Sequence, residues 1–293
     1  MVIGILCLYF LPAMAQELEP RVYANLPKKL NAAAFAYGLS KGNVLTDPAL
    51  PIENFKITAH NLGAGYVRTF GLADKLARIQ VFIPFIAMIG KLQLNGRDTS
   101  GTRTGFGDLR LRFGINLLGS KALDKKDFVR YEQKTIIGIS LVTSIPIGLY
   151  YSDKRINIGT NRWGFKPEIG ISRKFKRFYA EGYTGVWFYS GNTKYLNTKT
   201  LKQDPVFSLQ AHILYTLNKK MWLGFNGNWF SGGQTTIDDV ASGELNNNWR
   251  VGGTWSVAIN FQHSLKLQFH VGAFTNTGYD YNIVLLGYQF VFF

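Results

Sequence analysis

The chain has 293 residues, of which 17% are charged and 15% are aromatic, and its formal net charge is +15. In soluble proteins about a quarter of the residues are charged, yet no apolar run here reaches the ~18 residues that a transmembrane helix needs. The one cysteine, Cys7, lies near the N-terminus, which excludes a disulfide scaffold and a cysteine-ligated metal site. Apolar residues spread along the whole chain are typical of a transmembrane β-barrel.

The N-terminus has the features of an export signal. Residues 1–15 carry no charged side chain and end in a small-x-small site at Ala13 and Ala15. This pattern predicts a signal peptide over 1–15, cleaved after Ala15; a buried N-terminal helix is the alternative. We then expect a periplasmic N-terminal segment over 16–29 and a barrel over 30–293.

The strongest pattern further along the chain is an alternation of apolar and polar residues with period two. In 109–117 the odd positions are all apolar, whereas the even positions include Arg110 and Arg112. Because successive side chains of a strand point to opposite faces, this segment is predicted to be a strand with one apolar and one polar face. The same alternation recurs in 134–149, 162–172, 205–217, 249–261 and 265–271.

The pattern predicts about twelve strands and an all-β fold, a single transmembrane antiparallel up-and-down β-barrel in the bacterial outer membrane. The predicted strands are 30–40, 52–72, 76–87, 104–118, 134–149, 162–173, 178–189, 205–217, 221–230, 248–261, 265–274 and 281–293. A soluble β-sandwich behind the signal peptide is the alternative fold. It would stay in solution without detergent.

The connections between the predicted strands alternate between short and long. Short turns are expected at 73–75, 174–177, 218–220 and 262–264, and longer polar or Gly-rich loops lie between them. Outer-membrane barrels have short periplasmic turns and longer outer loops. The connection 119–133 departs from this rule because it is long and charged, and we expect it to hold a small periplasmic helix.

The polar faces of these strands supply the candidate functional residues. They are Asp108, Arg110, Arg112, Lys166, Glu168, Glu181, Gln210, His212, Arg250, Lys266 and His270. One interpretation is a basic constriction that attracts anionic or polarisable solutes; the other is that these charges pair across a largely plugged barrel. The two histidines have no third ligand at a recognisable spacing, so no metal site is predicted.

Other features predict partners. Short basic clusters between strands suit outer-membrane lipid and lipopolysaccharide headgroups, although solvated turns explain them equally well. Aromatic residues near strand ends, such as Trp163 and Trp249, suit the membrane interface. The aromatic C-terminal strand is expected to bind the barrel-assembly machinery. Nucleic acid is not an expected partner, because the basic residues form no single tract, and no cofactor is expected.

Two segments resemble signatures of a known family. They are TGFGDLR at 104–110 and NIGTNRWGFKP at 157–167, followed by a later Asp-Pro pair. The residues that carry the likeness are Gly105, Gly107, Asn157, Gly159, Asn161, Trp163, Pro167, Asp204 and Pro205. The chain resembles the MetA-pathway phenol-degradation family from about Tyr66 to the C-terminus. The resemblance implies a transporter-like outer-membrane barrel whose genes accompany aromatic catabolism, and it implies no mechanism.

These observations predict a passive outer-membrane channel that admits small aromatic or hydrophobic compounds. A non-conducting structural or surface-recognition barrel is one alternative. A lipid-modifying outer-membrane enzyme is another, which would need Ser, His and an acid in mutual reach. Since the chain has no Gly-x-Ser-x-Gly nucleophile motif, it is not predicted to be an enzyme.

Overall fold

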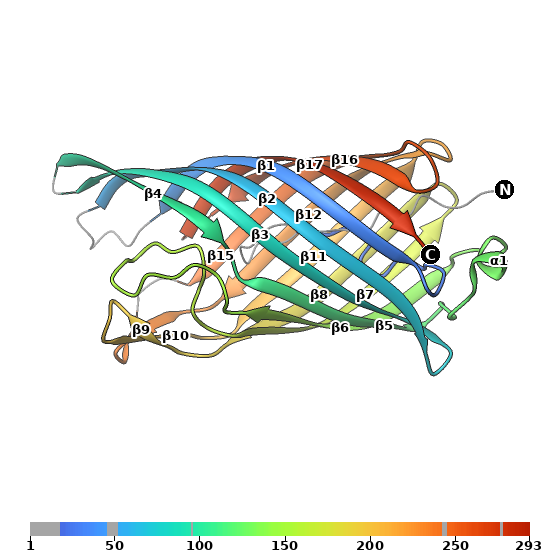
Figure 1. The fold of residues 1–293 in the computed structure, drawn as a ribbon, viewed down its shortest axis with the longest axis horizontal. Helices are drawn as coiled ribbons and strands as arrows, with labels where there is room; N and C mark the ends of the chain where they lie inside the picture. Colours follow the sequence, from blue (N-terminus) through green and yellow to red (C-terminus); the bar gives the residue numbers. More distant parts are fainter. Residues whose placement is uncertain (1–17, 46–51, 95, 242–244, 276–277) are drawn as a thin grey trace.

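The computed structural model describes residues 18–45, 52–94, 96–241, 245–275 and 278–293, so the predicted signal peptide lies outside the described residues. Twelve antiparallel strands form a closed barrel (Figure 1). The strands are β1 (Asn31–Leu45), β2 (Ile52–Leu72), β3 (Lys75–Leu94), β4 (Arg97–Phe106) with β5 (Leu109–Leu118), β6 (Thr135–Ile145), β7 (Gly164–Phe175), β8 (Phe178–Tyr189), β11 (Val206–Thr216), β12 (Met221–Gly232), β15 (Asn246–Ala258), β16 (His263–Phe274) and β17 (Gly278–Phe292). Because β4 and β5 both pair with β3, they form one barrel strand.

The first strand closes the barrel. β1 pairs with β2 on one side and with β17 on the other, where Asn31 opposes Phe292 and Ser40 opposes Ile283. Each barrel strand therefore has two hydrogen-bonded neighbours. Full pairing of backbone groups is what a lipid environment requires of a β-structure. The predicted twelve-stranded transmembrane barrel is confirmed.

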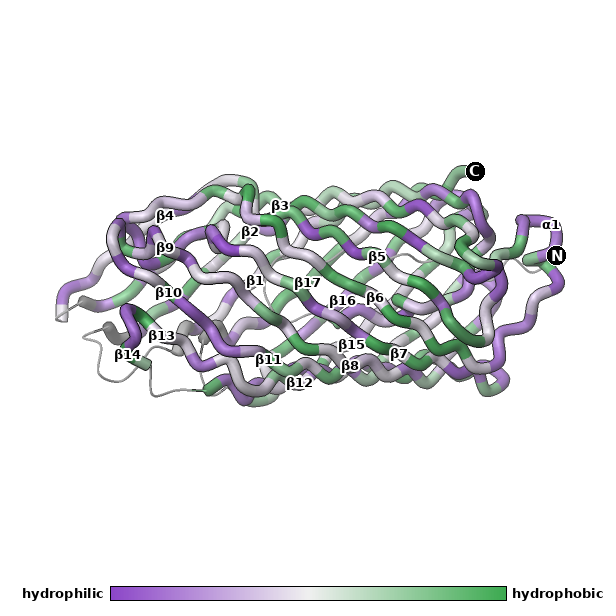
Figure 2. The backbone as a smooth tube through the Cα atoms, turned by 90° about the horizontal axis from the view of Figure 1, so that it is seen from below, coloured by the Kyte–Doolittle hydropathy of each residue, from purple (hydrophilic) through white to green (hydrophobic). Residues whose placement is uncertain are grey.

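The two faces of each strand meet different surroundings. In β7, Ile169 is 49% exposed on the outer surface, whereas its neighbour Glu168 is 5% exposed. Phe165 and Ile171 are exposed in the same way as Ile169, and Lys166 is buried like Glu168. Hydrophobic residues run along the barrel wall in Figure 2, and the connections at both ends are mostly hydrophilic. The apolar outer face suits a lipid bilayer, and the polar residues face the lumen.

The last strand has the same alternation up to the C-terminus. Leu286 and Phe292 are exposed on the outer face, whereas Gln289 and Val291 are buried. Phe293 follows the end of β17. Phe292 is therefore the terminal aromatic residue that faces outward within the strand.

The short turns lie together at one end of the barrel, which we call the turn end. Between β2 and β3, Ala73 and Asp74 have φ angles of 46° and 60°, as a two-residue turn of type I′ requires. The long connection 119–133 lies at the same end and contains one helical turn, α1 (Lys125–Phe128). Among the described residues, no helix has the length and the apolar character of a membrane span.

The opposite end, called the loop end here, holds more regular structure than the sequence predicts. Residues 90–103 continue the β3–β4 hairpin up to the pair Leu94 and Arg97. Strands β9 (Asn192–Tyr195), β10 (Lys199–Gln203), β13 (Thr235–Ile237) and β14 (Val240–Ala241) form a separate four-stranded sheet. These segments lack an apolar face, so period two does not reveal them.

Candidate functional site

The polar residues predicted for the lumen lie mostly inside the barrel wall. Nine are buried: Asp108, Arg112, Lys166, Glu168, Glu181, Gln210, His212, Arg250 and His270. Arg110 and Lys266 are half-buried. The structure brings only some of them together, and a segment that is not a strand joins them.

Residues 18–26, which precede β1, lie inside the barrel. The backbone N–H of Glu19 donates to Gln210 Oε1 at 3.0 Å, and that of Arg21 donates to Glu181 Oε2 at 2.6 Å. Leu18 and Tyr23 are almost completely buried. This placement differs from the periplasmic segment expected for 16–29. The reason is that the lumen buries the apolar side chains of the segment while its polar lining satisfies the backbone groups.

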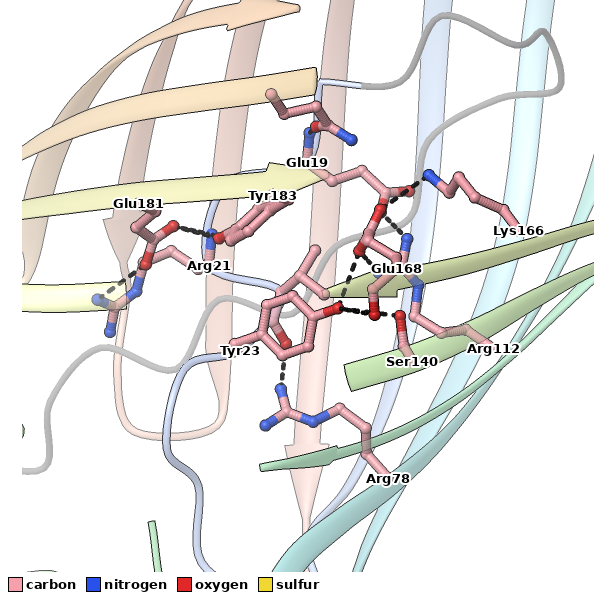
Figure 3. Close-up of polar contacts among 12 residues, drawn as sticks. Glu19, Arg21, Tyr23, Arg78, Arg112, Ser140, Lys166, Glu168, Glu181 and Tyr183 are labelled. Carbon is pink, nitrogen blue, oxygen red and sulfur yellow. Dashed lines mark hydrogen bonds and ion pairs between the residues drawn. The ribbon is translucent and has the colours of Figure 1, made fainter. Parts of the chain in front are cut away.

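A network of charged side chains fastens this segment at the centre of the lumen (Figure 3). Arg112 pairs with Glu168 on β7 at 2.9 Å and with Glu19 of the segment at 2.5 Å. Lys166 pairs with the second oxygen of Glu168 at 2.9 Å. Two cations therefore balance two carboxylates, as buried charges require. For Arg112, Lys166 and Glu168, the interpretation of paired charges across the lumen fits better than that of an open constriction.

Arg78 on β3 and Glu181 on β8 hold the segment from two further sides. The guanidinium of Arg78 donates to the carbonyl of Val22 and, at 2.8 Å, to that of Ala24. Glu181 accepts hydrogen bonds from Ser172 at 2.8 Å and from Tyr183 at 2.5 Å, besides that from the backbone of Arg21. The segment thus contacts strands on several sides of the barrel.

Tyr23 fits a gap in the barrel wall that two glycines create. Gly138 and Gly170 oppose each other on β6 and β7, and a Cβ on either would lie 2.3 Å or 2.1 Å from the Tyr23 ring. The hydroxyl of Tyr23 lies 3.1 Å from Ser140 Oγ and donates to Glu168 Oε1 at 3.1 Å. Glycine at these two lumenal positions therefore admits the ring that locks the segment in place.

A cavity of about 250 Å³, the loop-end cavity, lies between the central network and the loops. Trp187 and Tyr189 of β8 form one wall, with ring centroids 5.9 Å apart and an interplanar angle of 6°. The guanidinium of Arg162 lies 4.4 Å from the Tyr189 ring centroid, and that of Arg110 lies 5.7 Å from that of Trp187. Burial lowers the pKa of Arg162, but Tyr189 and Asp108 act in the opposite direction.

A second cavity, the turn-end cavity, has a volume of about 310 Å³ and lies on the other side of the segment. It is lined by Tyr179 and Trp222 and by five basic residues: Arg21, Lys174, Lys176, Arg177 and Lys219. The guanidinium of Arg21 lies 4.1 Å from the Tyr179 ring centroid. Along β8, Tyr179 thus marks the turn-end cavity, Glu181 and Tyr183 contact the segment, and Trp187 and Tyr189 line the loop-end cavity. Both cavities combine cations with aromatic rings.

Asp108 fastens a loop at the edge of the loop-end cavity. Its carboxylate accepts hydrogen bonds from the backbone N–H of Gly148 at 3.0 Å and from the N–H and hydroxyl of Thr160 at 2.9 Å and 2.6 Å. Asp108 also interrupts the predicted strand 104–118 between β4 and β5. Its oxygens are therefore occupied by the loop that covers the cavity.

The residues that carry the family resemblance build the loop end. The side chain of Asn157 bonds the backbone of Tyr151 in both directions, at 2.8 Å and 3.0 Å. A Cβ on Gly105 would lie 2.6 Å from Leu149, and one on Gly159 would lie 2.6 Å from the backbone of Gly148. Gly107 precedes Asp108 in the break between β4 and β5. At these residues, separate segments of the loop end lie in close contact with one another.

The other residues that carry the family resemblance are Asn161, Trp163, Pro167, Asp204 and Pro205. Asn161 donates to Asn192 at 2.8 Å, and Trp163 stacks on Phe165 on the outer face, with centroids 6.1 Å apart. Pro167 lies within β7. The backbone N–H of Asp204 and the carbonyl of Pro205 bond residues 233–234 of the neighbouring loop. None of these contacts involves the central charge network.

The two lumenal histidines, His212 and His270, are in contact with other residues of the barrel wall. His212 bonds Asn226 at 2.9 Å, and His270 lies against Gly252, where a Cβ would come within 2.2 Å of the imidazole ring. Arg250 donates to the carbonyl of Tyr281 at 2.7 Å. Within the part of the chain that the structure describes, no group of three His, Cys, Asp or Glu side chains could hold a metal ion.

Sequence reasoning missed the N-terminal segment and several of the residues that surround the cavities. Arg78 is the one charged residue in the largely apolar stretch 76–87 of β3, which indicates a lumenal position. Trp187 and Tyr189 lie near the end of the predicted strand 178–189, but the sequence does not show that they form a cavity wall. No local pattern identifies residues 18–26 as a lumenal segment, because their contacts lie far away in the sequence.

A comparison of the sequence with models of protein families identifies the family of the chain. The sequence matches the family described as "Putative MetA-pathway of phenol degradation" over residues 38–281, and the chain belongs to this family. No curated protein matches the chain. The resemblance found from the short sequence motifs is therefore confirmed.

Solved structures share the fold. The chain is similar to the COG4313 outer membrane channel from Pseudomonas putida F1, with a TM-score of 0.80 and 19% identity over 94% of this chain and 100% of that one. It is also similar to the β domain of the Bordetella autotransporter BrkA (TM-score 0.51, 12% identity, 90% and 100% covered) and to the KdgM porin in complex with disordered oligogalacturonate (0.50, 7%, 89% and 99%). At these identities, the likeness establishes the barrel fold alone.

Proposed function

We propose that this protein is a passive channel of the bacterial outer membrane for small aromatic solutes, and that its own N-terminal segment closes the lumen until it is displaced. The loop end then faces the outside and the turn end faces the periplasm, in line with the lengths of the connections. Membership of a family described by phenol degradation and the apolar outer face of the barrel support this proposal.

The observation that carries the proposal is the pair of cavities inside one lumen. The loop-end and turn-end cavities have volumes of about 250 Å³ and 310 Å³, and both place guanidinium groups over aromatic rings. Rings attract other rings and polarisable groups, whereas cations attract anionic or electron-rich ones. A solute that is aromatic and polar at one end therefore meets a favourable surface on each side of the segment.

The segment between the cavities is held by noncovalent contacts alone. The ion pair between Glu19 and Arg112 and the contacts of Tyr23 fasten it, and the one cysteine of the chain, Cys7, has no second cysteine with which to form a disulfide tether. Displacement would leave Arg112 and Lys166 paired with Glu168 on the barrel wall. Because Glu19 leaves with the segment, these three wall residues then carry an excess of one positive charge, and a solute could cross a polar, basic lumen.

A non-conducting structural barrel is the second candidate, favoured by the central charge network. In that case the segment blocks the lumen permanently, and no solute passes from one cavity to the other. A lipid-modifying enzyme is less favoured, because the polar clusters described above lie in the lumen and not on the lipid-facing surface.

Single-channel recording of the purified mature protein in a planar bilayer tests the proposal. We expect small discrete conductance steps that phenol or benzoate reduces in amplitude or duration. A correctly folded barrel that never conducts, even when the segment is destabilised by substitution, would contradict the channel and favour the structural barrel.

A further inference from the structure

The loop-end cavity is large enough for one aromatic ring. A cavity of about 150 Å³ accommodates benzene, and this one has about 250 Å³. Trp187 and Tyr189 from β8 form its aromatic wall, and Phe230 from β12 adds a third ring. Gly164 keeps the space in front of this wall open, since a Cβ there would lie 3.3 Å from both Trp187 and Tyr189.

One side of the cavity offers an unused hydrogen-bond donor on a cation. Arg162 donates from Nη2 to Gln203 at 2.6 Å, which orients the guanidinium. Its Nη1 is buried and has no hydrogen-bond partner among the described residues. A buried donor without an acceptor is costly, and a guanidinium presents its N–H groups in a fork that matches a carboxylate. The donor therefore indicates an anionic oxygen as its partner.

The charge of the cavity points the same way. Its charged lining residues are Arg110, Arg162 and Asp108. The carboxylate of Asp108 already accepts three hydrogen bonds from Gly148 and Thr160. The lining thus carries a net positive charge, and its one acid is engaged by the loop.

We infer that the loop-end cavity is a binding site for aromatic monocarboxylates, with the carboxylate on Arg162 and the ring against Trp187 and Tyr189. This inference deepens the proposed function and rests on it for its biological role. A neutral ring leaves the Arg162 donor unpaired, which a site built for hydrogen bonding rejects strongly. An aliphatic acid satisfies Arg162 but leaves the aromatic wall in contact with water.

Equilibrium binding to the detergent-solubilised full-length barrel, measured by calorimetry, tests the site with three probes. Benzoate carries both a ring and a carboxylate, benzyl alcohol lacks the charge, and acetate lacks the ring. We expect benzoate to bind more tightly than either of the others. Arg162→Gln should weaken benzoate binding about tenfold, the loss expected for one charge-assisted hydrogen bond, and should weaken binding of benzyl alcohol much less, because its neutral hydroxyl accepts only a weaker hydrogen bond.

The matched control is Arg155→Gln, which removes the same charge from an exposed position in the neighbouring loop outside the cavity. It should leave benzoate binding unchanged. Gly164→Val fills the space before the aromatic wall and should abolish binding of benzoate, so the test stands even if Arg162→Gln fails to fold. Equal affinities for the three probes, or equal effects of Arg155→Gln and Arg162→Gln, would overturn the inference.

The binding and conductance experiments fail in different ways. A barrel that conducts but does not bind benzoate refutes this site and leaves the channel intact. A barrel that binds benzoate through Arg162 but never conducts supports the site and refutes the channel.

Discussion

Replacing Gly170 by alanine should release the N-terminal segment from the lumen. A Cβ at this position would lie 2.1 Å from Cε2 and 2.4 Å from Cδ2 of Tyr23, and 2.7 Å from Cδ1 of Tyr183. Nonbonded carbon atoms approach to about 3.5–4.0 Å, so the Tyr23 ring must retreat by roughly 1.4 Å. That movement breaks its contacts with Ser140 and Glu168, which are both 3.1 Å long.

The size of the effect follows from the cost of overpacking. Inserting one methyl group into a filled site costs about 1–3 kcal/mol. With a factor of ten for each 1.4 kcal/mol, the ratio of docked to released segment falls about 5- to 150-fold. Tyr183 also contacts the new methyl group, and its hydroxyl bonds Glu181, which holds the backbone of Arg21. Movement of either tyrosine thus loosens the segment.

Single-channel recording measures the open probability, and limited proteolysis measures the exposure of residues 18–26. Gly182→Ala is the matched control, because a Cβ on Gly182 meets no atom closer than 3.9 Å. We expect Gly170→Ala to open more often and to be cleaved faster in this segment, and Gly182→Ala to match the parent. Parent-like behaviour of both variants would mean that the barrel wall yields and that the fit of Tyr23 does not hold the segment in the lumen.

Three further predictions concern Glu19 of the N-terminal segment and two residues of the loop end. Glu19→Gln removes one of the two carboxylates that pair with Arg112, so opening should become about tenfold more frequent; unchanged recordings would show that this ion pair does not hold the segment. Asp108→Asn weakens the bond to the backbone N–H of Gly148, and hydrogen exchange of that amide should accelerate about tenfold, whereas equal protection would place the loop's stability elsewhere. Gly159→Ala places a Cβ 2.6 Å from the backbone of Gly148 and should lower the free energy of unfolding by about 1–3 kcal/mol, as thermal denaturation can verify; an unchanged midpoint would mean that the loop adjusts freely.

The alternation of apolar and polar residues was enough to predict the barrel. In β7 the alternation of Phe165, Ile169 and Ile171 with Lys166 and Glu168 was sufficient to predict the strand and its two faces. The physical reason is local. Each side chain of a membrane strand faces either lipid or lumen, so apolar and polar residues must alternate along the strand. Where a strand has no apolar face, as in β9 or β13, this constraint is absent and the strands were not predicted.

The loop end was predicted only in part for the same reason. The resemblance motif around Asn157 and Gly159 was visible as a pattern, but its role in holding the loop against Gly148 depends on the fold. Arg162 stood within that motif as one more basic residue. Its significance comes from Trp187 and Tyr189 on another strand and from Gln203 in another loop.

The position of the N-terminal segment, in contrast, depends on the folded barrel. Residues 18–26 show neither helical nor strand periodicity, and their partners are remote: Glu19 bonds Gln210, 191 residues away, and Tyr23 bonds Glu168, 145 residues away. Such contacts depend on a closed lumen, which exists only after β1 has paired with β17. The local sequence could therefore specify a barrel with a polar interior, whereas the closed barrel alone could specify what fills it.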